Sequence, residues 1–116
     1  MSKRGGKGPD PLSQALPAEA LAAYVSLGCQ LAAQMAEANF RSITSAPGWT
    51  MAQVEDETEQ AIGRMEIVSR DMLAAKGSDP DGGQWREVWT AMEDRYRETM
   101  AELLRGSGLR VGETLQ

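Results

Sequence analysis

The chain contains no histidine and only one cysteine, and these two shortages remove much of the usual chemistry of enzymes. Without histidine there is no imidazole base, no catalytic triad that needs one, and no ligand of the type that transition metals most often use. Carboxylate and arginine side chains remain, but the sequence offers no convergent pair of them. We therefore expect a protein that is not an enzyme, with no catalytic residue, cofactor or metal site.

The single cysteine, Cys29, cannot form an internal disulfide framework, which is typical of a protein from a reducing compartment. It lies among Leu, Ala and Gly, without a nearby cation that would activate its thiol. We expect it to be buried and inert. The basic start of the chain is followed by Gly, Pro and Asp rather than by an apolar segment, so no signal peptide is expected. The sequence thus predicts a cytoplasmic protein.

Charge is unevenly spread along the chain. Three cations (Lys3, Arg4 and Lys7) against Asp10 give the first ten residues a charge of +2, which leaves −7 for the remainder of a chain whose net charge is −5. Nucleic-acid binding needs clustered cations that replace counterions, so we expect no direct binding of nucleic acid by the acidic remainder. Three cations supply little affinity, so the basic arm is expected to make weak contact at most.

The length of 116 residues predicts one domain. Residues 1–16 hold three glycines and two prolines without helical or strand periodicity, and we expect a flexible arm there. Residues 107–116 are short and polar and are expected to form a C-terminal tail. The helical domain should therefore occupy residues 17–106.

Three stretches within this domain carry apolar residues at helical spacing: about 17–45, 51–76 and 84–105. The connections between them are short and rich in proline, glycine and aspartate, which forces neighbouring helices to run antiparallel. The predicted fold is all-α, a three-helix up-down-up bundle with a flexible N-terminal arm and C-terminal tail.

Several residues mark the helix boundaries. Pro17 suits the first helical position, because its fixed φ and missing N–H cost nothing there. Thr50 and Gln53 form a capping box at the start of the second helix, and Trp49 with Val54 provides the matching hydrophobic staple. Trp49 is thereby explained by structure rather than by ligand stacking.

Glycines are expected to end the second and third helices. Gly77 follows Lys76 and Gly106 follows Arg105, the position where a left-handed residue stops a helix. The first helix should end before Pro47, since proline cannot continue a helix.

The first helix is the most apolar element. Residues 20–36 carry no charge, and apolar side chains cover roughly 200° of its circumference, about twice what a one-sided surface helix needs. The uncharged run is short for a transmembrane span, and a polar strip of Ser26, Gln30 and Gln34 crosses it. We therefore expect no transmembrane segment.

Small residues line one side of this helix. Gly28, Ala32 and Ala36 are spaced i, i+4 and i+8, which allows a second helix backbone to approach closely. A glycine in a helix interior costs up to about 1 kcal/mol relative to alanine, so it usually has a packing reason. The neighbour is either another helix of the same chain or a second subunit, and the sequence leaves both open.

The other two helices each carry one narrow apolar stripe. In the second helix it comprises Met51, Val54, Thr58, Ala61, Ile62, Met65, Val68, Ser69, Met72 and Leu73. In the third it comprises Trp85, Val88, Trp89, Met92, Tyr96, Thr99, Met100 and Leu103. Ile67 lies off the stripe and should be exposed or covered by a partner. Which of Trp85 and Trp89 is the more exposed is open.

Two narrow stripes cannot easily cover the wide arc of the first helix, so we expect part of it to contact a partner or a second copy. The predicted partner interface consists of Tyr24, Leu27, Gly28, Leu31, Ala32, Met35, Ala36 and Trp89. The six internal methionines could form an adaptable groove or bind a soft metal, but core filling explains them better.

An acidic run near the start of the second helix allows a further contact. Its members are Glu55, Asp56, Glu57 and Glu59. They could attract a basic partner electrostatically. The simpler interpretation is that acids in the first two turns favour the helix dipole and keep a small protein soluble. A metal site is disfavoured, because helical-bundle metal sites combine glutamate with histidine.

These features predict a non-catalytic helical protein–protein interaction protein. It would act as an accessory or assembly subunit, or as a small acidic inhibitor, through its first helix and an acidic face. The alternative is an amphipathic protein that coats storage granules or lipid surfaces. Its anionic face speaks against that alternative, since anionic membranes attract basic helices.

Overall fold

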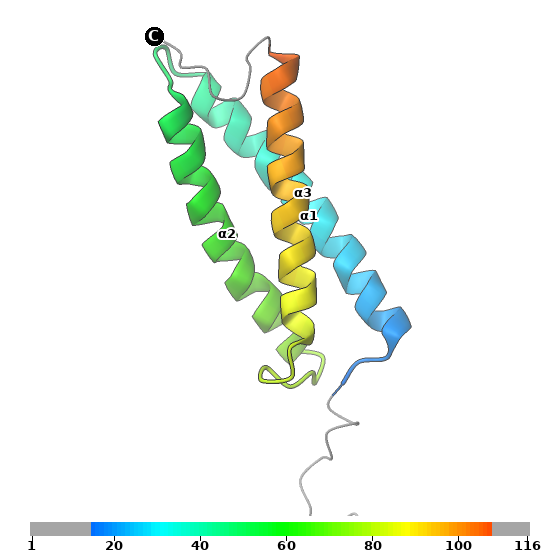
Figure 1. Cartoon of the computed structure of the whole chain (residues 1–116). Coiled ribbons are helices and arrows are strands. Elements are labelled where there is room, and N and C mark those ends of the chain that lie inside the picture. The colour runs from blue at the N-terminus through cyan, green and yellow to red at the C-terminus, as the bar shows by residue number, and fades with distance from the viewer. Residues whose placement is uncertain (1–14, 108–116) are drawn as a thin grey trace, which may run out of the picture.

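The computed structural model describes residues 15–107 of the chain. They form three helices: α1 (Ala18–Thr44), α2 (Met51–Ala74) and α3 (Gln84–Gly106). Short connections join them, so successive helices run in opposite directions (Figure 1). The predicted all-α, three-helix up-down-up fold is confirmed. Most of the predicted basic arm and C-terminal tail lies outside the described residues.

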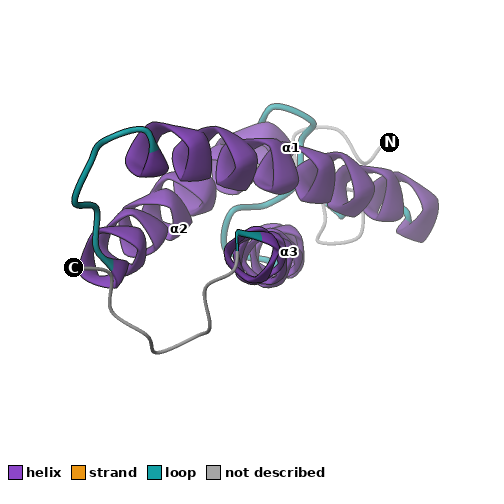
Figure 2. Cartoon of the chain, turned by 90° about the horizontal axis from the view of Figure 1, so that it is seen from above, coloured by secondary structure: helices purple, strands orange, loops and turns teal. Residues whose placement is uncertain are grey.

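The central element of the bundle is α3. In Figure 1, α1 passes behind α3 on a diagonal, while α2 runs beside α3 and diverges from α1 below their shared turn. Viewed from above, α3 is seen end-on against α1 (Figure 2). Both α1 and α2 pack mainly on α3 and much less on each other. One side of the α1–α2 pair is therefore left without a covering helix.

The core gathers around α3. Its buried apolar members are Ala32, Ala36, Val54, Ala61, Ile62, Met65, Leu73, Trp85, Val88, Met92, Tyr96, Met100 and Leu104. From α1 only two alanines belong to this group, while α2 and α3 supply the large side chains. The apolar arc of α1 is thus buried mainly through small residues, which bring its axis close to α3.

The start of α1 differs from the prediction by one residue. Pro17 is the N-cap, with φ −61° and an extended ψ of 156°, rather than the first helical residue. Its carbonyl oxygen accepts a hydrogen bond from the backbone N–H of Leu21 at 2.9 Å. The fixed φ of proline suits both the N-cap and the first helical position. The extended ψ of Pro17 identifies it as the N-cap.

The capping box at the start of α2 is confirmed. The backbone N–H of Gln53 donates to Thr50 Oγ1 at 3.3 Å, and the backbone N–H of Thr50 donates to Gln53 Oε1 at 2.8 Å. Val54 is buried, and the half-buried Trp49 packs against the core. This arrangement fixes the angle at which the chain turns from α1 into α2.

Gly77 ends α2 as expected, although the helix itself stops at Ala74. Gly77 has φ +88°, and the N–H groups of Gly77 and Ser78 donate to the carbonyls of Ala74 and Leu73. This Schellman arrangement satisfies carbonyls at the helix end. Gly106 is different: it is the last residue of α3 and has no positive φ, so it is not the left-handed stop that we expected.

A glutamine side chain ties the start of α1 to the start of α3. Gln84 Nε2 donates to the carbonyl oxygen of Leu16 at 3.0 Å, and Gln84 Oε1 accepts from the Leu16 N–H at 2.9 Å. The same oxygen accepts from the hydroxyl of the buried Ser78 at 2.7 Å. One amide thus joins the segment before α1 to the α2–α3 connection and the start of α3.

Two predicted core positions are wrong. Val68 was expected in the buried stripe of α2, but it is 44% exposed, because α1 diverges from α2 and leaves that side of α2 uncovered. In α3 the buried residue of the last turn is Leu104, with Leu103 only half-buried. The buried positions Met92, Tyr96 and Met100 repeat every four residues, and Leu104 continues that spacing.

Candidate functional site

The small-residue line of α1 packs inside the chain. Ala32 and Ala36 are fully buried, and a Cβ atom placed on Gly28 would lie 2.8 Å from Met92 Cγ and 3.1 Å from Val88 Cγ1. The neighbour left open by the sequence is therefore α3. These three residues are covered within one chain, which corrects their place in the predicted partner interface. A partner could reach only the side chains that flank them.

Two polar contacts run along the same α1–α3 interface. Asn39 Nδ2 donates to the hydroxyl oxygen of the buried Tyr96 at 2.9 Å. The thiol of Cys29 lies 3.7 Å from the carbonyl oxygen of Ala91, in a hydrogen-bond arrangement. Cys29 is half-buried rather than fully buried, so its expected burial is only partly met. Both contacts help to hold α1 in register on α3.

The flanking residues of α1 face an apolar groove between α1 and α2. The groove has a volume of about 410 Å³ and is lined by Leu31, Gln34, Met35, Ala38, Arg64, Met65, Val68 and Met92. Its lining is apolar except for Gln34 and Arg64. It lies on the side of α1 and α2 that α3 does not cover, which is where the divergence of the two helices leaves space.

Three methionines from three different helices meet in this groove. Met65 and Met92 are nearly fully buried and contribute to the lining from the core, while Met35 is half-buried on the α1 wall. Methionine side chains are flexible and polarisable, so they adapt to the shape of a bound partner. The same methionines can therefore fill the core and line an adaptable groove.

Both helices that form the groove also carry exposed apolar side chains. Leu27 on α1 is 43% exposed, and on α2 Ile67 and Val68 are 63% and 44% exposed. Leu31 and Tyr24 are half-buried. Leu27, Leu31 and Met35 are thus the members of the predicted interface that belong to this surface. We name the groove lining, together with the exposed Leu27 of α1 and Ile67 of α2, the α1–α2 face.

Of the two α2 residues of this face, Ile67 was expected to be exposed or covered by a partner, and it is exposed, whereas Val68 was wrongly assigned to the core. Ile67 and Val68 are consecutive apolar residues in a helix, so they point about 100° apart and cannot both face the same neighbour. The sequence interpretation assigned Val68 to the core and left Ile67 outside. Both are exposed. The exposure of Val68 depends on the direction in which α2 meets α1, and that direction was not readable from the sequence pattern.

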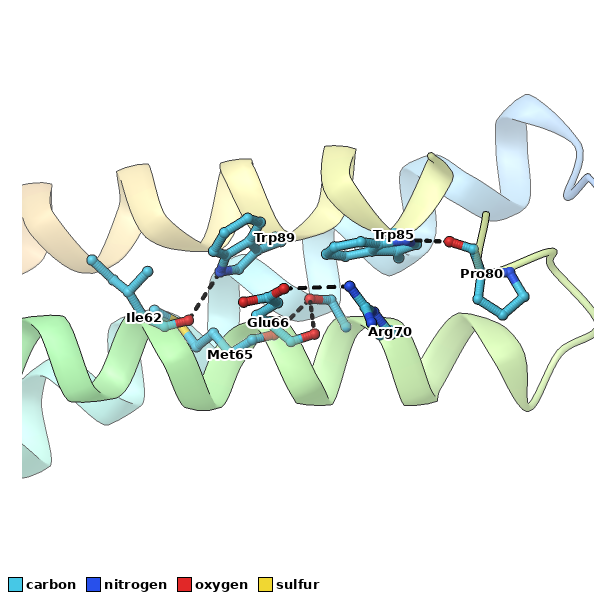
Figure 3. Close-up of polar contacts among 8 residues, drawn as sticks. Ile62, Met65, Glu66, Arg70, Pro80, Trp85 and Trp89 are labelled. Atoms are coloured by element: carbon cyan, nitrogen blue, oxygen red, sulfur yellow. Dashed lines mark hydrogen bonds and ion pairs between the residues drawn. The ribbon is translucent and has the colours of Figure 1, made fainter. Parts of the chain in front are cut away.

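Trp89 lies at the α2–α3 interface (Figure 3) and is not among the residues that line the groove. Its indole N–H donates to the carbonyl oxygen of Ile62 at 2.9 Å. The neighbouring Trp85 is buried and donates to the carbonyl of Pro80 at 2.6 Å, with the Arg70 guanidinium 4.2 Å from its ring centroid. Trp89 is the more exposed of the two, but its indole N–H already donates a hydrogen bond within the chain.

The acidic residues of α2 are partly paired within the chain. Glu57 accepts from Arg64 at 2.6 Å, Glu59 accepts from Arg97 at 3.3 Å, and Asp56 accepts from the amide of Gln60 at 2.9 Å. Surface ion pairs of this kind stabilise the fold by at most about 1 kcal/mol each. The cations of a basic partner could therefore replace the arginines at these carboxylates. Glu55 and Asp56 are exposed on the same stretch.

Arg97 bridges two helices. It binds Glu59 of α2 at 3.3 Å and Glu93 of its own helix at 3.2 Å. Burial disfavours its charged form, but the hydrogen bonds to Glu93 and Glu59 outweigh that effect and raise the pKa of Arg97. Because the folded-state pKa is raised, this contribution to stability is fully present below the ordinary arginine pKa and is lost only in strong alkali.

A second, polar hollow of about 450 Å³ lies beside this bridge. It is lined by Val54, Glu55, Thr58, Glu59 and Arg97. The hydroxyl of Thr58 donates to the carbonyl of Val54 at 2.8 Å, and Arg97 is held by its two carboxylates. The polar groups of this hollow are thus mostly engaged with one another.

Within residues 15–107, no group of three or more histidine, cysteine or acidic side chains is placed so that it could hold a metal ion. None of the three described helices combines the length and the hydropathy needed to cross a membrane. Comparisons of the chain with protein-family models, with curated proteins and with solved structures find no match.

Proposed function

We propose that the chain is a non-catalytic helical interaction protein, an accessory or assembly subunit or a small acidic inhibitor, whose docking surface is the α1–α2 face. The observation that carries this proposal is the apolar groove of about 410 Å³ between helices that meet only loosely. The exposed Val68 lines the groove, and the same two helices carry the exposed Leu27 and Ile67. Such a concentration of exposed apolar surface on a small protein is typical of an interaction site.

The shape of the groove fits a helix or an extended segment that inserts one or two apolar side chains. Binding energy at protein interfaces is concentrated in a few anchors that fill apolar pockets, and helix-in-groove contacts follow this rule. Met35, Met65 and Met92 can adjust to such an anchor. The α1–α2 face is then the functional centre of the molecule, and α3 is the scaffold that holds both walls.

The acidic run on α2 supports a second, electrostatic contribution. Residues 15–107 carry a net charge of −7, and Glu55 and Asp56 are exposed. A charge of one sign speeds the association of an oppositely charged partner more than it increases affinity. This contribution would serve the inhibitor form of the proposal, in which the partner is basic. The expected cytoplasmic location belongs to the same proposal.

The surface-coating alternative has less support. A coating helix needs its apolar arc free to lie on a lipid or granule surface. In this chain the small-residue line of α1 is buried against α3, and Leu31 and Met35 of the same helix line a groove rather than a flat surface. Flotation with lipid or polymer particles would separate the two ideas, and the proposal expects no co-flotation.

Site-specific photo-crosslinking tests the proposal. A photoreactive amino acid is placed at Leu31 or Val68, which line the groove, and at Glu98, an exposed control position on α3. Cross-links to protein are expected from the two groove positions and not from the control. Equal cross-linking at all three positions, or none at the groove positions, would count against the α1–α2 face as a docking surface.

A further inference from the structure

The segment before α1 is bound at the start of α3 much as a protein binds a peptide. The Gln84 amide pairs with both the N–H and the carbonyl oxygen of Leu16, at 2.9 and 3.0 Å. The Leu16 side chain is half-buried and packs against the core, whereas Ala15 and Pro17 on either side are exposed. We name residues 15–17 the strap, and Leu16 is its anchor.

The sequence of the strap suits this contact. A residue that precedes proline is restricted to extended backbone, in which its N–H and carbonyl oxygen point to the same side. One planar carboxamide can therefore pair with both groups of Leu16, as a residue of a neighbouring strand would. Main-chain hydrogen bonds of this kind, combined with a side chain on an apolar surface, are a general mode of recognition of extended peptides.

The site that holds the strap is built from other parts of the chain. Gln84 is the first residue of α3, and its Oε1 also accepts from the hydroxyl of the buried Ser78 at 2.7 Å. The backbone N–H of Ser78 donates to the carbonyl of Leu73 at the end of α2. The indole N–H of Trp85 donates to the Pro80 carbonyl at 2.6 Å and closes the connection. The Gln84 amide therefore stays oriented when the strap leaves.

Release of the strap leaves no buried polar group without a partner among these contacts. The hydroxyl of Ser78 keeps its acceptor on Gln84, and the polar atoms of Leu16 become accessible to water. Two hydrogen bonds and one half-buried leucine hold the strap, whereas α1 is held by close packing along α3. The strap should therefore open locally while the three helices remain folded.

We propose that the strap is an internal ligand of a peptide-binding site at Gln84, and that the released site binds an extended segment of a partner protein. The segment seated on the site in this chain defines the chemistry of that partner, an apolar residue followed by proline. Neither Gln84 nor Ser78 lines the α1–α2 groove. The site is thus a second docking site, and it goes beyond the proposed function.

The probe for this site is a synthetic peptide with the sequence of residues 13–19, SQALPAE, titrated into the isotope-labelled full chain and followed by NMR. In the wild-type chain the strap competes with the peptide. Leu16→Asp removes the anchor and should lower the Kd of the peptide by roughly tenfold or more, because the site is then free in most molecules. Ala22→Asp, at an exposed position of α1, is the matched control and should leave Kd at the wild-type value.

Further variants test the recognition itself. Far-UV circular dichroism verifies folding, and Leu16→Ala takes the place of Leu16→Asp if the aspartate variant does not fold. Adding Gln84→Ala to the Leu16 variant should abolish peptide binding, and so should a peptide in which aspartate replaces the leucine. In the wild-type chain, the amide hydrogen of Leu16 should exchange with solvent faster than that of the buried Ala32, because the strap opens without global unfolding.

Three results would overturn the proposal. The first is a peptide that does not bind the Leu16 variant, or binds it no more tightly than the wild-type chain. The second is peptide binding that persists after Gln84→Ala, which would place the peptide elsewhere on the molecule. The third is a Leu16 amide that exchanges as slowly as that of Ala32, since the strap would then be released only by global unfolding.

Discussion

A methyl group on Gly28 of α1 would lie 2.8 Å from the Cγ atom of Met92 of α3. Few carbon pairs in proteins approach so closely, because the van der Waals contact distance of two carbon atoms is about 3.5–4.0 Å. The absence of a side chain at Gly28 therefore sets how near α1 comes to α3. That close approach in turn leaves α1 directed away from α2 and opens the groove between them.

Gly28→Ala should destabilise the chain. Alanine is the better helix former by up to about 1 kcal/mol, but the added methyl overlaps with Met92 and Val88, and overpacking of this kind costs about 1–3 kcal/mol. We expect a net loss in the free energy of unfolding, measured by urea titration of the circular dichroism signal. A gain in stability would mean that α1 can move away from α3 at little cost.

Gly63→Ala is the matched control, with the opposite expected sign. Gly63 lies inside α2, is exposed, and has no atom within 4 Å of an added Cβ. The helix propensity of alanine should therefore appear undiminished, as a stabilisation of up to about 1 kcal/mol in the same titration. If both substitutions shift stability in the same direction, the explanation that Met92 and Val88 leave no room for a side chain at position 28 is contradicted.

Ala32→Leu should disrupt folding. Ala32 is fully buried in the α1–α3 interface, so three further carbon atoms must displace α3 or distort α1, at a cost of about 1–3 kcal/mol or more. Ala22→Leu, at an exposed position of the same helix, should be close to neutral. The melting temperatures of the two variants, measured by thermal unfolding, test this difference. Equal melting temperatures would show that the interface tolerates the larger side chain.

Thr50→Ala should cost about 1 kcal/mol in the free energy of unfolding. It removes the hydroxyl that accepts from the Gln53 N–H at the start of α2. Thr50→Ser keeps the acceptor and should cost much less. Since Thr50 and Gln53 cap each other reciprocally, Gln53→Ala should be less than additive with Thr50→Ala in a double-mutant cycle. Full additivity would mean that the two caps act independently.

Trp89→Phe should loosen the contact between α3 and the middle of α2. It keeps an aromatic ring but removes the N–H that donates to the Ile62 carbonyl, a loss of about 1 kcal/mol. Trp85→Phe removes the bond to Pro80 instead and should act on the α2–α3 turn. Hydrogen exchange followed by mass spectrometry distinguishes the two. Faster exchange near Ile62 in the Trp85 variant alone would contradict this assignment.

Gln84→Ala should destabilise the chain by about 1–3 kcal/mol, because it leaves the buried hydroxyl of Ser78 without its acceptor and frees both polar atoms of Leu16. Gln84→Glu retains the acceptor but not the donor, so its loss should be smaller. Limited proteolysis near Leu16 reports on the release of this segment. Unchanged proteolysis in the alanine variant would show that other contacts hold it.

The elements themselves were largely predictable from local signals. The capping pair Thr50–Gln53 and the left-handed Gly77 act within one turn of chain, so their effect does not depend on the rest of the fold. The buried spacing of α2 and α3 was readable for most positions, because one face of each helix meets the core. The prediction that Val68 is buried was wrong, because its burial depended on the position of α1.

The predicted partner interface was likewise only partly readable from the sequence. Leu31 and Met35 were identified from the wide apolar arc of α1, and both line the groove. Gly28, Ala32 and Ala36 came from the same arc, yet they face α3. Periodicity groups residues onto a face, but it does not say which neighbour that face will meet.

The sequence by itself determined three helices, most of their ends and the residues that share each face, because hydrogen bonding and side-chain periodicity along a helix are local. Only the tertiary structure decided how those faces pair. The small residues of α1 allow a close approach to α3, and α1 then diverges from α2. That packing geometry, a balance of steric fit among three helices, is what exposes Val68 and Ile67 and opens the groove beside them.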